Sequence, residues 1–179
     1  MIRIQHIGLA LALALPFSTG CLPELPKDKA LTRFVYDEGN TMTSAQRTSL
    51  DSLLRAYEQR TTNEIVVFTS ADTTSDTDTI FRNEVQRLND TLGVGKLFKR
   101  NGLVLGFSDR LHEVYTLSQQ AMAPDTAQTM ALTDSVILPL ISDRRIYDAL
   151  LAGTHAFMDM ADSLSAQKQR RRAARKAKD

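Results

Sequence analysis

Three aspartates stand at positions where an α/β protein could bind a hard cation. Asp37 ends a short apolar run, Asp109 follows a longer one, and Asp125 begins a helical pattern. Ligands of α/β sheets collect at the carboxyl ends of strands, and calcium takes about six to eight oxygen ligands. We therefore predict a calcium site at Asp37 and Asp109, with Asp125 as a further ligand. The more common alternative is structural: an Asx turn, a hairpin turn and a favourable carboxylate in the first turn of a helix.

A phosphate ester is the second ligand that these residue types suggest. His112 lies close in sequence to Asp109 and Arg110. Hydrolysis needs a positioned nucleophile or a metal-activated water, and the sequence has no G-x-S-x-G elbow, P-loop or C-x-x-x-x-x-R motif. We therefore rank phosphatase activity below a non-catalytic function and expect His112 on the surface of a strand.

Cys21 is the single cysteine of the chain, and it follows an apolar leader with a positive start at Arg3. The leader is too short to span a membrane and is typical of a signal peptide. Small residues before Cys21 make this position similar to the lipobox of bacterial lipoproteins, in which the thiol is acylated after the leader is removed. We predict lipidation of Cys21. The alternative is ordinary secretion with cleavage near Gly20.

Charge is unevenly distributed along the chain. Residues 22–167 contain 14 basic and 20 acidic residues, a net charge of −6, whereas residues 168–179 contain seven basic residues and one acidic residue. The acidic body argues against nucleic-acid binding. The basic end lacks an apolar face, so its cations either contact an anionic membrane surface or extend the last helix into solvent. Its first four basic residues are Lys168, Arg170, Arg171 and Arg172.

The elements that must position these residues alternate between strand and helix patterns. Apolar and β-branched runs predict strands at residues 34–36, 64–69, 102–107 and 111–117, the last two joined as a hairpin. Helical spacing of apolar residues fills the intervals and the region after residue 124. The residues expected to begin or end helices are, in order, Thr43 with Gln46 as a capping box, Gly93, Pro124, Pro139, and Ser142 or Asp143.

This alternation predicts an α/β fold, a three-layer sandwich whose central four-stranded sheet is mostly parallel and includes a hairpin, flanked by about four helices. We expect a lipoprotein signal peptide at residues 1–20 and a tether at 21–32. The α/β domain then occupies residues 33–162. A basic tail, helical or disordered, follows at 163–179.

Six segments occur in the order in which they occur in the TPM domain family of thylakoid-lumen and bacterial envelope proteins. They are residues 35–43, 64–69, 92–95, 101–105, 109–110 and 137–153. The chain therefore resembles that family over residues 33–162. It departs from the family pattern at residues 117–122, where a glycine-rich stretch is replaced, and at Arg100, where the family has an aspartate.

The resemblance implies a protein of the cell envelope, and some family members are described as calcium-binding or as acid phosphatases. We expect a lipoprotein that is anchored in the bacterial envelope and faces the periplasm or the cell surface. Its expected function is non-catalytic: it binds a membrane-protein partner and helps to maintain it, without nucleic acid or an organic cofactor. A metal-dependent phosphatase of the TPM type is the alternative.

Overall fold

The computed structural model describes residues 30–71, 77–123 and 125–177. Four strands form one sheet in the order β1-β2-β3-β4. The strands β1 (Val35–Asp37), β2 (Glu64–Thr69) and β3 (Gly102–Ser108) are parallel, and β4 (Glu113–Ser118) is antiparallel to β3. The sheet is therefore mostly parallel and ends in the predicted hairpin, which makes β4 an outer strand.

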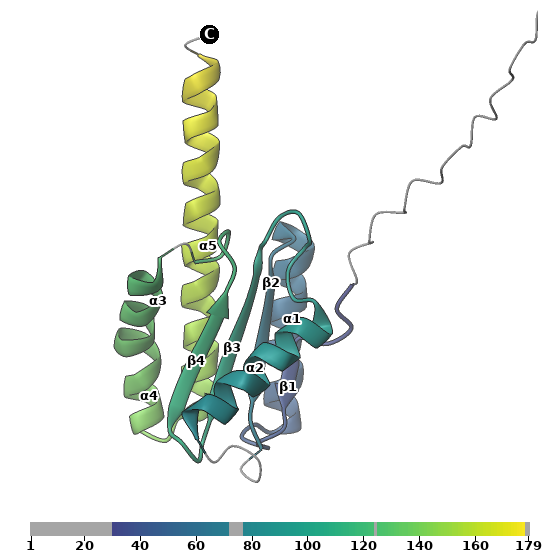
Figure 1. The fold of residues 1–179 in the computed structure, drawn as a ribbon, viewed down its shortest axis with the longest axis vertical. Helices are drawn as coiled ribbons and strands as arrows, with labels where there is room; N and C mark the ends of the chain where they lie inside the picture. The colour runs from purple at the N-terminus through teal and green to yellow at the C-terminus, as the bar shows by residue number, and fades with distance from the viewer. Residues whose placement is uncertain (1–29, 72–76, 124, 178–179) are drawn as a thin grey trace, which may run out of the picture.

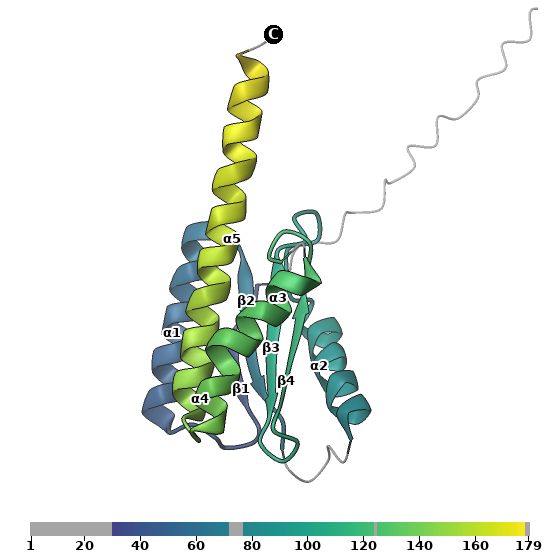
Figure 2. The same cartoon turned by 90° about the vertical axis from the view of Figure 1, so that its left-hand side faces the viewer.

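Helices cover both faces of this sheet (Figures 1 and 2). On one face lie α1 (Ser44–Thr61), α5 (Ile146–Lys176) and the segment that contains α3 (Thr126–Leu132) and α4 (Leu138–Ser142). The other face is covered by α2 (Asp78–Leu92). Every residue of β2 and β3 is buried, as expected for central strands that are covered on both sides. The three-layer α/β sandwich predicted from the sequence is confirmed.

Local capping signals place the ends of the first two helices. Thr43 and Gln46 form the predicted capping box at the start of α1, and Gly93 ends α2 with its amide bonded to the carbonyl of Asn89. Leu50 and Leu54 lie on the buried face of α1. Both cap predictions are confirmed. They could be made from short stretches of sequence because each cap depends on side chains and amides within one helical turn.

The prediction that the third helix ends near Pro139 is wrong. The helical path continues from α3 (Thr126–Leu132) through one π-helical turn, η1 (Thr133–Ile137), into α4 (Leu138–Ser142). A proline normally clashes with the carbonyl four residues earlier. Here the Leu138 amide already bonds five residues back, to Thr133, so Pro139 lies at the start of a new helical register where its missing N–H is not needed.

Neither Ser142 nor Asp143 caps the last helix, so that prediction is also wrong. Ser142 belongs to α4, where its hydroxyl donates to the carbonyl of Leu138 at 3.0 Å. Arg144 then turns the chain with a φ of 59°. Arg145 occupies the N-cap position of α5 without a side-chain cap, and its guanidinium pairs with Asp148 at 2.9 Å.

The last helix, α5, extends well past the sheet (Figure 1). Its buried residues end at Ala161, and every residue from 165 to 177 is exposed. The exposed part to Lys176 adds about 18 Å of helix. Within the described ranges, no helix has both the length and the apolar character needed to cross a membrane. The predicted signal peptide, Cys21 and the tether before residue 30 lie outside the described residues.

Two glycines allow close packing, one between a helix and the sheet and the other between two helical segments. A Cβ atom on Gly106 of β3 would lie 2.6 Å from Val85 Cγ2 on α2. A Cβ atom on Gly153 of α5 would lie 2.6 Å from Ile137 Cδ1 on η1. Neither neighbour leaves room for a side chain, so these glycines fix the distance of α2 from β3 and of η1 from α5.

Candidate functional site

Asp37, at the end of β1, is the predicted metal ligand with the most complete set of partners. Its carboxylate accepts hydrogen bonds from the amide and hydroxyl of Thr41, the amide of Met42, the guanidinium of Arg47 and the hydroxyl of Thr69. The distances run from 2.6 Å to 3.1 Å. A carboxylate has about four lone-pair sites, and the Asp37 side chain has no exposed surface. Asp37 therefore holds the loop between β1 and α1 in place.

The protonation of Asp37 follows from these contacts. Burial raises the pKa of the carboxyl, but the hydrogen bonds from Thr69, Arg47 and Thr41 outweigh this effect, so its pKa is lowered from the ordinary value. Hydrogen bonds to the ionised form favour that form. Arg47, 2.9 Å away, supplies the positive charge that a bound cation would otherwise bring.

The other two predicted ligands do not join Asp37. Asp109 follows β3 at the same edge of the sheet, with β2 between the two strands; its side chain is 39% exposed and pairs with Arg144 at 3.6 Å. Asp125 caps α3 by accepting from the Ala127 amide at 2.9 Å, beyond the opposite end of the sheet (Figure 1). Among the described residues, no three His, Cys, Asp or Glu side chains form a group that could hold a metal. These aspartates do not fit one shared calcium site.

His112 lies in the turn before β4, not on the strand itself, because β4 begins at residue 113. Its φ of 50° turns the chain into the strand, and its side chain is exposed. Asp109 pairs with Arg144. The short spacing in sequence therefore does not produce a nucleophile and base in contact.

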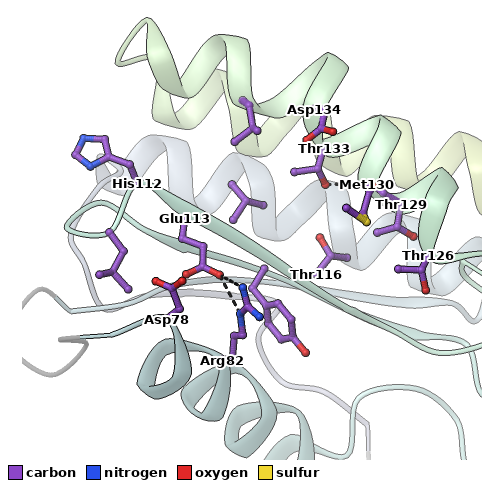
Figure 3. Close-up of a pocket in the computed structure, with 14 residues that line it drawn as sticks. Asp78, Arg82, His112, Glu113, Thr116, Thr126, Thr129, Met130, Thr133 and Asp134 are labelled. Carbon is purple, nitrogen blue, oxygen red and sulfur yellow. Dashed lines mark hydrogen bonds and ion pairs between the residues drawn. The ribbon is translucent and has the colours of Figure 1, made fainter.

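A cleft of about 680 Å³ lies along β4. Figure 3 shows this cleft between two walls, with β4 between them. Asp78 and Arg82 come from α2, and Thr126, Thr129 and Met130 come from α3. The side chain of Met130 is 59% exposed. The cleft therefore follows the outer edge of the sheet, away from Asp37.

An ion pair between Arg82 and Glu113 links α2, one wall of the cleft, to β4. Arg82 donates from Nε and Nη2 to the same oxygen, Glu113 Oε1, at 3.0 and 2.8 Å. These bonds raise the pKa of Arg82, and the guanidinium also lies 5.5 Å from the centre of the Tyr115 ring. The second carboxylate oxygen, Glu113 Oε2, is buried and has no hydrogen-bond partner in the described structure. In Figure 3 the Asp78 carboxylate points toward the carboxylate of Glu113.

Thr116 presents a second unpartnered polar atom in the same cleft. Its Oγ1 is buried without a hydrogen-bond partner among the described residues, and it points toward Met130 (Figure 3). Buried polar groups in folded proteins are nearly always paired. By contrast, the hydroxyls of Thr129 and Thr133 donate to backbone carbonyls one turn earlier. Thr116 and Glu113 are therefore the polar groups that a ligand in the cleft would pair.

No pattern in the sequence predicts this cleft. Glu113, Tyr115 and Thr116 belong to a run that predicts only a strand, and Arg82 lies in an interval that predicts only a helix. The signal available was weak: a charged residue at the start of the last strand of a hairpin. Arg82 and Glu113 are 31 residues apart in sequence, so their pairing leaves no local pattern.

The end of the sheet near residue 100 carries a different surface. Phe98 is 76% exposed, and it lines a small hollow with Lys99, Arg100, Leu164 and Lys168. An apolar side chain and several cations therefore meet where α5 leaves the domain. The basic residues predicted to touch a membrane continue along the exposed part of α5.

A buried ion pair supports the loop that carries Phe98. Glu64 is 1% exposed and accepts from the Lys96 ammonium and from the Gly95 amide, the latter at 2.6 Å. Lys96 also lies 3.2 Å from Glu58. Burial lowers the pKa of Lys96, but its bonds with Glu64 and Glu58 outweigh this effect and raise it. The loop is thus fixed to the start of β2.

Solved structures with the same fold come from several bacteria. The N-terminal domain of a P. gingivalis protein has a TM-score of 0.63 and 22% identity, covering 74% of this chain and 83% of that domain. The BA42 protein of Bizionia argentinensis has a TM-score of 0.58 and 14% identity, covering 69% and 83%. The N-terminal domain of cg2496 from Corynebacterium glutamicum has a TM-score of 0.51 and 14% identity, covering 79% and 84%. At these identities the likeness shows the fold alone.

Comparison with curated proteins gave no match. The family model described as the TPM domain matches residues 35–160, which include all four strands and the first half of α5. The match agrees with the resemblance drawn from the six sequence segments. It covers more than half of the chain, and the chain belongs to the TPM domain family.

Proposed function

We propose that this protein is a non-catalytic binding module of the bacterial cell envelope that acts on membrane-protein partners. The observation that carries the proposal is the cleft along β4, with two buried polar atoms, Glu113 Oε2 and Thr116 Oγ1, that lack partners among the described residues. Such a cleft suits a ligand that brings its own donors. In contrast, the carboxylate of Asp37 is already occupied by the protein itself.

The proposed location of the protein is the membrane surface. A lipid on Cys21, which lies outside the described residues, would hold the chain at a membrane and direct it to the periplasm or the cell surface. The exposed cations Lys168, Arg170, Arg171 and Arg172 on α5 would then meet anionic lipid headgroups. Each basic residue near such a surface contributes about 1 kcal/mol, screened by salt.

Site-specific photo-crosslinking in a Gram-negative host tests the partner. A photoreactive amino acid replaces Met130 in the cleft or, as a control, the exposed Ser49 on α1. We expect a membrane protein to be crosslinked from position 130 and not from position 49. Absence of a product, or the same products from both positions, would contradict the proposal.

Membrane association has its own test. We expect Cys21→Ser to move the protein from the membrane fraction to the soluble fraction of the same host. Replacing the four α5 cations by glutamine should weaken binding to vesicles that contain phosphatidylglycerol but leave binding to phosphatidylcholine vesicles unchanged. Equal binding to both vesicles by the parent protein would remove the electrostatic contact from the proposal.

The alternative, a metal-dependent phosphatase, makes the opposite prediction. Hydrolysis of p-nitrophenyl phosphate in the presence of calcium or magnesium, lost in Asp109→Asn, would favour it. Asp109 is the suitable position because its carboxylate is partly exposed and its replacement leaves the Asp37 contacts intact. We expect no metal-dependent hydrolysis.

A further inference from the structure

The outer strand β4 has backbone groups available for pairing. The amide of Gln119 donates to the carbonyl of Gly102 at 2.9 Å, and in an antiparallel ladder hydrogen-bonded pairs alternate with non-hydrogen-bonded pairs. Leu117, Tyr115 and Glu113 therefore direct their N–H and C=O groups toward β3. Val114 and Thr116 direct theirs away from β3, to the open side of the sheet.

The cleft provides space beside these groups. A strand added to a sheet lies about 4.8 Å from its neighbour and points alternate side chains to the two faces. Here α2 borders one face of the cleft and α3 with η1 borders the other, as Figure 2 also shows for the open side of β4. Added side chains would therefore contact protein on both faces.

Two polar side chains of β4 indicate which hydrogen-bonding groups the side chains of an added strand would need. On the α2 face, Glu113 Oε2 needs a donor. On the α3 face, Thr116 Oγ1 needs a donor or an acceptor. Both atoms lack solvent-accessible surface, so each side chain must rotate toward the cleft before it can pair with a group that enters.

Charge selects among the possible occupants. Asp78, Glu113 and Asp134 line the cleft. The basic lining residues are His112 and Arg82, and Arg82 is bound to Glu113. A lysine or arginine side chain would complement this surface. A second copy of the chain, joined through β4, would bring two acidic surfaces together.

We propose that β4 accepts an extended segment of a partner protein as a fifth strand, with a basic side chain beside Glu113 and Asp78. The backbone of the segment would bond to the N–H and C=O groups of Val114 and Thr116. This inference rests on the proposed binding function and specifies its ligand and its mode of binding.

Heptapeptides selected from a random phage-displayed library on the full chain carrying Cys21→Ser provide the probe. We expect the selected peptides to share a lysine or arginine at one position. On binding, hydrogen exchange should slow at the amides of Val114 and Thr116, while the Tyr115 and Leu117 amides, already bonded to β3, should change little. Methylation of alternate peptide amides should abolish binding, and methylation shifted by one residue should not.

Variants separate the backbone and charge contributions. Thr116→Pro removes an outward N–H without removing a bond to β3, and an outer strand tolerates proline at such a position; we expect about tenfold weaker peptide binding. Glu113→Gln should remove the preference for a basic residue. Thr48→Val, on the exposed surface of α1, is the matched control and should bind as the parent does.

Several outcomes would overturn strand addition. Failure to select any peptide would do so, as would binding that is insensitive to amide methylation or equal protection of all four β4 amides. Concentration-dependent protection of Val114 and Thr116 without peptide would identify a second copy as the occupant instead. If these tests fail while Met130 still crosslinks a membrane protein, the binding function stands and only the mode of binding is wrong.

Discussion

The corner at Asp37 and the cleft at Glu113 both place a carboxylate at the margin of the sheet, but they differ in how its oxygens are used. Asp37 has no exposed side-chain surface, and both of its oxygens accept hydrogen bonds from the protein. Glu113 is 16% exposed in its side chain; one oxygen accepts twice from Arg82, and the other has no partner in the described structure. The first arrangement stabilises the fold, whereas the second leaves capacity for a ligand.

The energetic reason is the cost of leaving a buried polar group unpaired, about 1–3 kcal/mol. At the Asp37 corner this cost is avoided by donors from α1, β2 and the intervening loop. At the cleft it is not avoided at Thr116 or at Glu113 Oε2. Removing the polar group should therefore lower the free energy of unfolding at the Asp37 corner and raise it in the cleft.

The largest effect is expected for Asp37→Ala. This change leaves Arg47, Thr69 and two backbone amides without their acceptor, so we expect a loss of about 3 kcal/mol in the free energy of unfolding. Urea denaturation measures it. Asp125→Ala, which removes only a helix cap, should cost about 1 kcal/mol. Equal losses in the two variants would show that the Asp37 corner has no special role.

The second prediction concerns pH. Because the pKa of Asp37 is lowered in the folded protein, its ionised form contributes stability that is present above the unfolded pKa of about 4. That contribution is lost as pH falls through the lower, folded pKa. The free energy of unfolding should therefore decrease in acid more steeply for the parent than for Asp37→Asn. Parallel pH curves for the two proteins would contradict this assignment.

A smaller effect of opposite sign is expected in the cleft. Thr116→Val replaces the unpartnered hydroxyl by a methyl group of similar size and should stabilise the protein by about 1 kcal/mol. The midpoint of urea unfolding should rise with an unchanged slope. Thr154, whose buried Oγ1 also lacks a partner among the described residues, offers a matched comparison as Thr154→Val. Destabilisation by Thr116→Val alone would mean that its hydroxyl has a partner after all.

The smallest effect is expected from calcium. Because Asp37 is occupied and Asp109 and Asp125 lie elsewhere, calorimetric titration of the protein should give no saturable heat. Asp109→Ala provides the control. Heat that saturates in the parent and disappears in this variant would place a cation at the end of β3 and would reopen the phosphatase alternative.

Much of the architecture was predictable from short stretches of sequence. The buried strand at Glu64–Thr69 follows from a β-branched run, and the hairpin follows from two apolar runs joined by Asp109 and Arg110. The path through Pro139 was not predictable, because it depends on a π-helical turn that brings Ile137 against Gly153 of α5. The packing of η1 against α5, and not a local sequence pattern, therefore determines the path of the chain at this turn.

The sequence by itself determined the caps at Thr43 and Gly93, the order of strands and helices, and the membership of the TPM domain family. Each of these depends on neighbouring residues or on their order. Only the tertiary structure decided that Asp37 is fully occupied and that a cleft lies along β4. Thr69 reaches Asp37 across 32 residues, and Arg82 reaches Glu113 across 31. Contacts of this range are set by how helices pack on the sheet, and no local pattern of residues encodes them.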